Sequence, residues 1–393
     1  MKIAMLGHKV VPSRRGGIER VLTALCPVMA EKGLDITLYN RSTDLVEGEY
    51  KDAVSDGKYK GIKLKKAFSL KSRGISAMMA SFTGAICVAL GKYDIVHFHA
   101  EGPCAAMWLV KMFGKKCVAT VHGLDWQREK WGKGFASKYI KFGEKVMVKY
   151  ADEIIVLSES AKKYFKDTYG RKTVVIHNGI EKPVLKEAFE ITKRYGIEKN
   201  GYIAIVSRLT AEKGIHYLIE AYNNIKTDKK LVIAGDTSDT DEYVKMLQNM
   251  AAGNENIIFT GFISGDVLCE IYSNAYAICL PSDIEGMSLS LLEALSYKNA
   301  VLCSDISENA SVAEDKAMYF EKGNVADLTE KLQYLCDNKD VAEEYKEHSD
   351  EFVLNKYKWS DIADETAKLY EKVLSGKEGK SYEPENKRET ISR

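Results

Sequence analysis

Short runs with β-branched residues alternate along the chain with longer segments whose apolar positions recur at helical spacing. In the first half these runs lie at 2–6, 35–39, 62–67, 94–99, 116–121, 153–157 and 173–177. In the second half they lie at 202–206, 230–234, 256–260, 276–280 and 300–304. Strands that alternate with helices build βαβ units and parallel sheets. The pattern therefore predicts an α/β fold with two doubly wound, Rossmann-like domains.

The alternation pauses near Asn178-Gly179 and restarts after Pro183. We therefore predict an N-terminal domain over 1–181 and a C-terminal domain over 182–357, with a final helix over 358–374. The remaining residues, 375–393, are polar and rich in charge, and we expect them to be a disordered tail. Ligands of such sheets bind beyond the carboxyl ends of the strands, so we expect the site in a cleft between the two domains.

Charge changes this picture, because the net charge of +1 conceals two opposite halves. Residues 1–180 hold 31 Lys and Arg against 17 Asp and Glu, a net charge of +14. Residues 181–393 hold 26 against 39, a net charge of −13. Such an asymmetry indicates an anionic surface or ligand for the basic half.

Cysteine usage and the chain start point to the cytoplasm. The eight cysteines stand singly, without a CxxC pair, and read as reduced core residues. The apolar stretch before His8 and Lys9 is too short for a signal peptide. The uncharged stretch 74–91 approaches membrane-spanning length, but its serines, threonine and glycine favour a buried or membrane-facing amphipathic helix.

The most informative motif is Glu285-Gly286-Met287-Ser288, which follows the predicted strand 276–280 and opens a helix near Met287. Unpaired N–H groups and the helix dipole at such a start favour a phosphate or sugar hydroxyls. Glu293 lies about two turns into the helix, so the two carboxylates would contact separate parts of one ligand. The alternative is that Glu285 is only a favourable charge at the helix start and Glu293 an exposed helix residue.

Two further loops carry candidate ligand-binding groups. Arg208 and Lys213 follow the first strand of the second domain, where two cations could neutralise a diphosphate; solvation of surface charge is the alternative. Gly16 and Gly17 follow the first strand of the first domain and open a helix. Adjacent glycines permit close approach of an oxygen-rich ligand, although this pair alone is weak evidence.

Together these motifs resemble those of the retaining GT4-family glycosyltransferases of the GT-B fold, in particular enzymes that build bacterial surface polysaccharides. The resemblance rests on the following segments, in this order: Gly16-Gly17, Val121-His122-Gly123, Asn178-Gly179, Ser207-Arg208-Leu209 with Lys213-Gly214, and Glu285 to Glu293. It covers the chain to about residue 374. It implies a nucleotide-sugar domain at the C-terminus, an acceptor domain at the N-terminus, and a final helix that crosses back to the first domain.

The resemblance also implies roles for single residues. It assigns Arg208 and Lys213 to the diphosphate, and Glu285 with the amides of Gly286, Met287 and Ser288 to the donor sugar and phosphate. It further assigns Glu293 to the ribose, Gly17, beside Gly16, to the distal phosphate, and His122 to the transferred sugar. The catalytic set would then be His122, Glu285, Arg208 and Lys213.

No metal or other cofactor is expected, because cations and helix N-termini would stabilise the leaving diphosphate. Asp239-Thr240-Asp241 more plausibly caps the helix that follows it than binds a metal. His97 and His99 share one face of a strand, and His122 lies after the next strand, which leaves a three-histidine metal site open.

The acceptor is expected to be a glycan linked to a lipid diphosphate. Lysines crowd the segment 58–73, beside the uncharged stretch 74–91. Such a segment can dock on an anionic membrane surface, with a solvated loop as the alternative. The predicted location is therefore the cytoplasm, with a possible peripheral position on the inner face of the cell membrane.

Two other functions fit part of the sequence. A GT-B nucleotide-sugar epimerase, or another enzyme that does not transfer the sugar, would share the architecture. A nucleic-acid-binding protein would explain the basic half, but no basic and aromatic recognition motif is present and we expect no nucleic-acid partner. The identity of the nucleotide and of the sugar is not encoded in the motif spacing.

Overall fold

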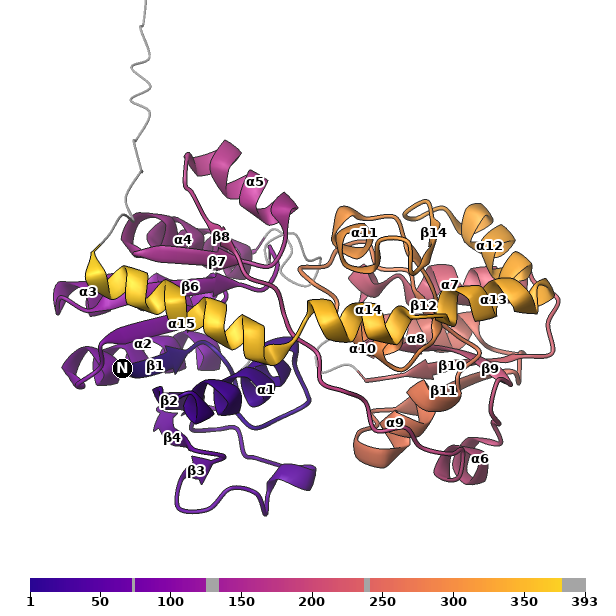
Figure 1. Cartoon of the computed structure of the whole chain (residues 1–393), viewed down its shortest axis with the longest axis horizontal. Helices are drawn as coiled ribbons and strands as arrows, with labels where there is room; N and C mark the ends of the chain where they lie inside the picture. Colours follow the sequence, from indigo (N-terminus) through magenta and orange to yellow (C-terminus); the bar gives the residue numbers. More distant parts are fainter. Residues whose placement is uncertain (73–74, 125–133, 237–240, 377–393) are drawn as a thin grey trace, which may run out of the picture. The chain divides into compact units, whose positions relative to one another are not determined.

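The computed structural model describes residues 1–72, 75–124, 134–236 and 241–376 (Figure 1). Within these ranges the chain divides into two compact units. Unit 1 runs from residue 1 to 177 and includes 360–376, and unit 2 comprises 178–359. The sequence-based boundary after residue 181 lies four residues beyond this division. The residues of the predicted tail from 377 onward, and Asp239-Thr240, lie outside the described residues.

Unit 1 is built on a sheet of eight strands. The strands are β1 (Lys2–Leu6), β2 (Asp35–Arg41), β3 (Lys58–Tyr59), β4 (Ile62–Ala67), β5 (Ile95–His99), β6 (Lys116–Val121), β7 (Glu153–Val156) and β8 (Val174–Val175). The helices are α1 (Gly17–Glu31), α2 (Ile75–Leu90), α3 (Met107–Met112), α4 (Phe135–Tyr150), α5 (Glu159–Tyr169) and α15 (Trp359–Ser375), with short 3₁₀ turns η1 (Gly48–Tyr50) and η2 (Gly102–Ala106).

Unit 2 is built on a sheet of six strands. The strands are β9 (Tyr202–Val206), β10 (Lys230–Ala234), β11 (Ile257–Gly261), β12 (Ala277–Leu280), β13 (Ala300–Ser304) and β14 (Met318–Phe320). The helices are α6 (Glu190–Tyr195), α7 (Ile215–Asn223), α8 (Asp241–Met250), α9 (Gly265–Asn274), α10 (Leu289–Ser296), α11 (Ser307–Ala313), α12 (Val325–Asp337), α13 (Lys339–Lys346) and α14 (Ser349–Lys356), with the 3₁₀ turn η5 (Ala211–Lys213).

Both sheets have the strand order of doubly wound folds. The order is β3-β4-β2-β1-β5-β6-β7-β8 in unit 1 and β11-β10-β9-β12-β13-β14 in unit 2. Among the strands named above, all pairings are parallel except that of β3 with β4. The order reverses between β1 and β5 and between β9 and β12, and ligands of such sheets bind beside this reversal. The predicted α/β class with two Rossmann-like units is confirmed.

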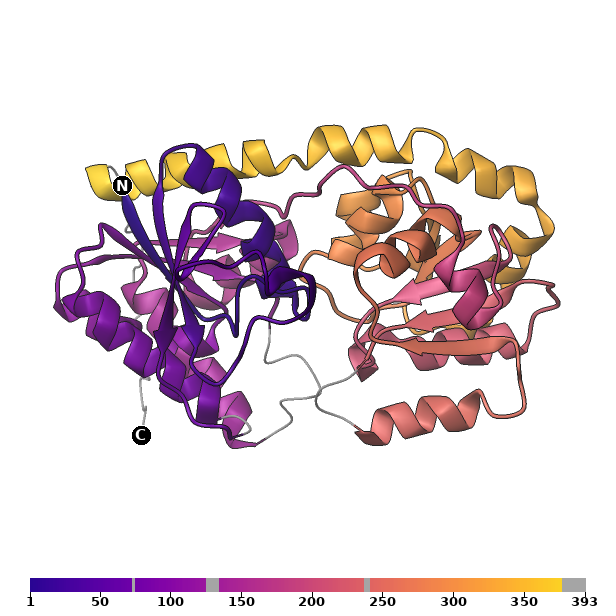
Figure 2. The same ribbon diagram turned by 90° about the horizontal axis from the view of Figure 1, so that it is seen from below.

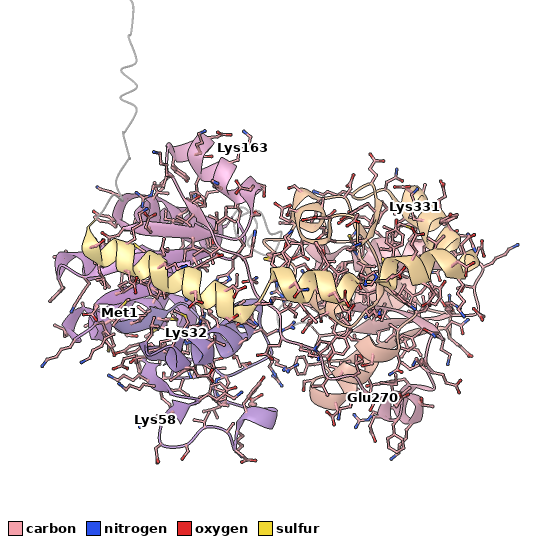
Figure 3. The ribbon with its side chains drawn as sticks, viewed as in Figure 1. Met1, Lys32, Lys58, Lys163, Glu270 and Lys331 are labelled. Atoms are coloured by element: carbon pink, nitrogen blue, oxygen red, sulfur yellow. The ribbon has the colours of Figure 1, made fainter. Side chains whose placement is uncertain are left out.

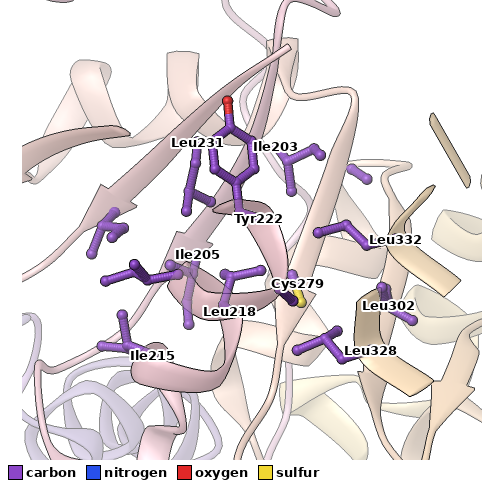
Figure 4. Close-up of a cluster of buried hydrophobic side chains, with 14 of the residues drawn as sticks. Ile203, Ile205, Ile215, Leu218, Tyr222, Leu231, Cys279, Leu302, Leu328 and Leu332 are labelled. Atoms are coloured by element: carbon purple, nitrogen blue, oxygen red, sulfur yellow. The ribbon is translucent and has the colours of Figure 1, made fainter. Parts of the chain in front are cut away.

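Each unit has its own apolar core between sheet and helices. In unit 2, Ile203 and Ile205 of β9 pack with Leu218 of α7 and Leu328 and Leu332 of α12 (Figure 4). In unit 1 the equivalent cluster gathers β1, β5 and β6 with α2, α3 and α4. Five cysteines are buried, as predicted, whereas Cys87 on α2 is exposed and Cys269 and Cys336 are half-buried. Among the described residues, no helix combines the length and the apolar character needed to cross a membrane.

The C-terminal helix α15 packs on unit 1 (Figure 2), and polar contacts fix its position along its length. Nζ of Lys32, the C-cap residue of α1 that is labelled in Figure 3, lies 2.7 Å from Oδ1 of Asp364. Further along, the Tyr370 hydroxyl lies 2.6 Å from Nδ1 of His97 on β5, whose Nε2 lies 2.7 Å from Oγ1 of Thr120. His97 is buried, and the loss of hydration lowers its pKa to about 3. The histidine is therefore neutral in the folded chain at neutral pH.

A buried neutral histidine predicts a loss of stability in acid. The unfolded chain binds a proton at this position below about pH 6.5, whereas the folded chain does so only near pH 3. His97 alone should therefore lower the free energy of unfolding by about 1.4 kcal/mol between pH 7.5 and pH 5.5. Urea unfolding measures the free energy of unfolding at both pH values. Between them, this free energy should fall by about 1.4 kcal/mol less in His97→Gln than in the wild type. Equal pH dependence of the two proteins would contradict the assignment.

Candidate functional site

The charged groups predicted to bind a diphosphate follow two neighbouring strands of unit 2. Arg208 and Lys213 lie between β9 and α7, and Glu285 lies between β12 and α10. Because β9 and β12 are adjacent and parallel, their carboxyl ends meet at the reversal of strand order. The two loops predicted from separate motifs are thus neighbours.

Hydrogen bonds to backbone carbonyls hold the two loops and their flanking elements together. The N–H of Asp283 donates to the carbonyl of Glu212 at 2.9 Å, and Oγ of Ser290 donates to the carbonyl of Val206 at 2.8 Å. Gly214 has a φ of +63°, and a Cβ there would lie 1.9 Å from the carbonyl oxygen of Pro281. Only glycine permits both this conformation and this approach. The backbone conformation and this close contact therefore explain why glycine follows Lys213 in the motif.

Lys213 and Glu285 form an ion pair across the two loops. Nζ of Lys213 lies 2.6 Å from Oε1 of Glu285, which also accepts a hydrogen bond from Oγ of Ser282 at 2.8 Å. The side chains are 17% and 9% exposed, so the pair is largely shielded from water. Water is the main competitor of such a pair, and its exclusion strengthens the attraction. The ammonium group is thereby held at the carboxyl edge of the sheet.

Arg208 is held less tightly than Lys213. Its guanidinium lies 3.9 Å from Oε1 of Glu212, and its side chain is 42% exposed. The Glu212 carboxylate is buried, with a side chain only 6% exposed. The exposed Arg208 side chain can therefore turn its N–H donors toward a ligand, while the buried Glu212 carboxylate stays close to it.

The helix after Glu285 begins later than predicted. Helix α10 starts at Leu289, with Ser288 as its N-cap, whose Oγ accepts the N–H of Leu291 at 3.3 Å. The amides of Gly286 and Met287 therefore belong to the loop before the helix rather than to its first turn. Met287 is buried, and its Sδ lies 3.1 Å from the backbone N of Asn178. The Asn178-Gly179 motif thus packs against the candidate loop.

Glu293 lies in the second turn of α10 and faces the interior of unit 2. It is 9% exposed, so the alternative of an exposed helix residue is wrong. The Tyr272 hydroxyl donates to its Oε2 at 3.1 Å, and the ring of Tyr272 stacks on Tyr297. Glu285 thus contacts Lys213 and Ser282, whereas Glu293 accepts a hydrogen bond from Tyr272, whose ring is stacked on that of Tyr297.

In unit 1 the loop between β1 and α1 holds Gly16 and Gly17. Glu19 in the first turn of α1 accepts the N–H of Lys9 at 2.7 Å. A Cβ on Gly16 would lie 1.9 Å from the Glu19 carboxylate, whereas a Cβ on Gly17 would meet nothing within 4 Å. Packing within the chain thus explains Gly16 but leaves room over Gly17.

His122 follows β6 and belongs to a histidine cluster on unit 1. Its Nε2 lies 3.0 Å from Nδ1 of His99, whose ring stacks on that of His97 at 4.3 Å. Burial lowers the pKa of His99 well below its usual value. Throughout the described residues, no group of three or more His, Cys, Asp or Glu side chains is arranged to hold a metal ion. The three-histidine metal site left open by the sequence is therefore not formed by these residues.

Sequence patterns missed several residues that shape the unit 1 loop. Asn40 on β2 accepts the N–H of Val11 at 3.0 Å and donates to its carbonyl at 2.9 Å, and its Oδ1 lies 2.9 Å from Nε2 of His8. Glu19 is equally buried. A lone buried Asn or Glu in a strand or helix carries no motif. The one available signal is a polar residue in an apolar run, as Asn40 is after Leu38-Tyr39.

Comparison with known proteins identifies the families of the two halves of the chain. The family described as "Glycosyltransferase Family 4" matches residues 15–182, and that described as "Glycosyl transferases group 1" matches residues 187–352. An uncharacterized glycosyltransferase of Methanocaldococcus jannaschii, MJ1607, is 24% identical over 94% of this chain and 98% of its own length. The capsular polysaccharide biosynthesis glycosyltransferase CapM of Staphylococcus aureus is 25% identical over 67% of this chain and 72% of its own length.

A solved structure supports the fold. The structure of Anabaena HepE in complex with UDP and glucose has a TM-score of 0.77 at 16% identity, and the match covers 94% of this chain and 99% of that one. Two family matches in the expected order, together with this architecture, account for nearly the whole chain. The chain belongs to the GT-B glycosyltransferases, with a Glycosyltransferase Family 4 domain followed by a Glycosyl transferases group 1 domain.

Proposed function

We propose that the protein transfers a hexose-type sugar, with retention of anomeric configuration, from a nucleotide diphosphate sugar to a lipid-linked glycan acceptor. The single observation that carries the proposal is the shielded Lys213–Glu285 pair on two loops locked at the strand-order reversal of unit 2. The names of related proteins support it, since CapM is named for capsular polysaccharide biosynthesis and HepE was solved with UDP and glucose.

The chemistry needs positive charge where the sugar leaves. Breaking the bond between the anomeric carbon and the phosphate oxygen leaves negative charge on the diphosphate. Lys213 and Arg208 would stabilise that charge, and so would the N-terminus of α10 and the amides of Gly286, Met287 and Ser288. These groups are in place before the reaction, so no metal is required in this proposal.

Transfer is proposed to occur on one face of the sugar. A new bond forms between the acceptor hydroxyl oxygen and the anomeric carbon as the bond to the phosphate oxygen breaks. The hydroxyl proton passes to an oxygen of the leaving phosphate. Glu285 and His122 would orient the sugar, and Glu293 would bind the ribose. No carboxylate then has to act as a covalent nucleophile.

In unit 1 the proposal assigns Gly17 to the distal phosphate, with Gly16 supporting the loop. The open space over Gly17 supports this assignment, because a glycine that packing does not require is free to serve a ligand. Gly16 is the N-cap of α1, and the N-terminus of this helix would favour an anion.

A lipid-linked acceptor calls for contact with a membrane, and α2 offers a suitable face. The helix holds no charged residue, and its exposed Ile75, Ile86 and Leu90 recur at helical spacing. Exposed lysines accompany it on the preceding segment: Lys58, Lys60, Lys65, Lys66 and Lys71. Lys63 is committed to Asp35 at 2.7 Å. We propose that this face docks on anionic lipid at the inner surface of the cell membrane.

The proposed activity is tested with a panel of UDP-, GDP- and dTDP-sugars, a lipid diphosphate glycan acceptor, and EDTA in the buffer. We expect transfer with one donor, and NMR of the product should show the anomeric configuration of the donor. An inverted product or complete loss in EDTA would contradict the mechanism. An epimerised donor without transfer would instead support the non-transferring alternative.

Removal of the Lys213 charge should slow transfer. Lys213→Ala is expected to lower kcat by about 100-fold, because one preorganised charge at the leaving group is lost in the transition state. Lys213→Arg should retain more activity than the alanine variant. As a matched control, Lys186→Ala removes another lysine–carboxylate pair of unit 2, with Asp266 at 3.4 Å, and should leave kcat unchanged. Unchanged turnover in Lys213→Ala would refute the role.

Membrane docking is tested by sedimentation with vesicles that contain an anionic lipid. Replacement of Lys60, Lys66 and Lys71 by glutamine should weaken binding by about 100-fold, because each surface cation contributes about 1 kcal/mol. Ile86→Glu should also weaken binding, whereas Phe189→Glu, at an exposed apolar position of unit 2, should not. Binding that is independent of anionic lipid, or unaffected by these changes, would remove the proposal.

A further inference from the structure

The histidine assigned to the transferred sugar has one of its ring nitrogens engaged inside unit 1. Nε2 of His122 lies 3.0 Å from Nδ1 of His99, within hydrogen-bond distance. Two lone pairs cannot form a hydrogen bond, so one of these nitrogens carries a proton. If His99 donates, the single proton of a neutral His122 lies on its Nδ1; if His122 donates, that Nδ1 has only a lone pair. The direction of this hydrogen bond therefore decides whether His122 offers a donor or an acceptor to a ligand.

The surroundings of His99 decide this question. The residue is 2% exposed, and its second nitrogen, Nε2, is buried without a hydrogen-bond partner. Burial favours the neutral ring, which has a single proton to place. A proton on Nε2 would leave a buried N–H without an acceptor, whereas a proton on Nδ1 leaves only a buried lone pair. Orphaned buried N–H groups are the rarer of the two, so Nδ1 is the donor.

We propose that His99 is a positioning residue that donates its Nδ1–H to Nε2 of His122 and thereby fixes His122 as the Nδ1–H tautomer. His122 then presents an N–H donor, rather than a lone pair, at its other nitrogen. A hydrogen-bond donor suits a sugar hydroxyl oxygen or a developing negative charge. The part of this inference that concerns the sugar rests on the proposed function; the tautomer does not.

His99 is itself held in place, its ring by His97 and its backbone by Gly7. It stacks on His97 with the centroids 4.3 Å apart and the planes 27° apart. Both nitrogens of His97 are engaged, by the Tyr370 hydroxyl at 2.6 Å and Thr120 Oγ1 at 2.7 Å. The backbone of His99 lies against Gly7, where a Cβ would approach its carbonyl oxygen to 2.1 Å. The stack on a His97 ring with both nitrogens engaged therefore limits rotation of the His99 ring away from His122.

The tautomer can be read directly from the full-length protein labelled with ¹⁵N-histidine. Long-range ¹H–¹⁵N correlation distinguishes a protonated from an unprotonated ring nitrogen, and the His122→Gln variant assigns the signals. We expect His122 to carry its proton on Nδ1 and His99 to carry its proton on Nδ1. A proton on Nε2 of His122 would overturn the proposal. Because no substrate is needed, this result stands even if the proposed transfer activity fails.

Two substitutions of His99 separate positioning from packing. His99→Leu removes the donor, whereas His99→Asn keeps an N–H donor near the place of Nδ1. In His99→Leu we expect the His122 signals to become a mixture of tautomers and kcat to fall at least tenfold, with KM for the donor sugar little changed. In His99→Asn the His122 tautomer and most of kcat should be retained.

The exposed His348 of unit 2 serves as an internal control, since its signals should not change in either variant. Thermal unfolding checks that both variants are folded at the assay temperature. An unchanged His122 tautomer in folded His99→Leu would overturn the proposal. Equal loss of kcat in folded His99→Leu and His99→Asn would overturn it as well, because packing alone would then account for the effect.

Discussion

The close approach of Gly214 to the carbonyl of Pro281 sets the position of the charged groups in unit 2. It brings the loop after β9 against the loop after β12, so that Lys213 and Glu285 meet although 72 positions separate them in the chain. A Cβ at residue 214 would overlap the carbonyl oxygen of Pro281, so any other residue would force the two loops apart. The ion pair, its partner Ser282 and the shielding from water all depend on this backbone contact.

The same constraint recurs at other strand ends. Gly235, after β10, has a φ of +148°, and a Cβ there would lie 1.8 Å from the carbonyl oxygen of Ser207. Gly7, after β1 in unit 1, stands in the same relation to His99. Neighbouring parallel strands end at one edge, and their loops compete for the same space above it. Glycine at these ends leaves that space to the side chains of the neighbouring loops.

The fold could be predicted closely from the apolar pattern, for a physical reason. Central strands of a doubly wound sheet are buried on both faces, so they appear as continuous apolar runs; β1, β6, β9, β10 and β13 begin and end at the predicted residues. The bounds of β4 were also predicted, although half of this lysine-rich strand is exposed. The strands that escaped prediction, β3 and β14, have two and three residues and too little pattern to detect. Helix α10 starts two residues after the predicted Met287, because Ser288 caps it.

The candidate site was predictable only in part. Glu285, Lys213 and Arg208 stand in motifs next to strand ends, and topology alone places such loops together. The burial of Glu293 against Tyr272 and the contact of His99 with His122 depend on which face of a helix or strand turns inward, and on side chains distant in sequence. The charge asymmetry falls close to the division between the two units. It did not indicate that Lys213 of the acidic unit forms a shielded ion pair with Glu285.

The central claim is that the loops locked by Gly214 bind the diphosphate of a nucleotide sugar. Hydrogen–deuterium exchange measured by mass spectrometry, with and without saturating UDP, GDP or dTDP, tests it most directly. The account predicts that the nucleotide that binds slows amide exchange in segments 207–214 and 282–290. Binding that leaves exchange in both segments unchanged would contradict it.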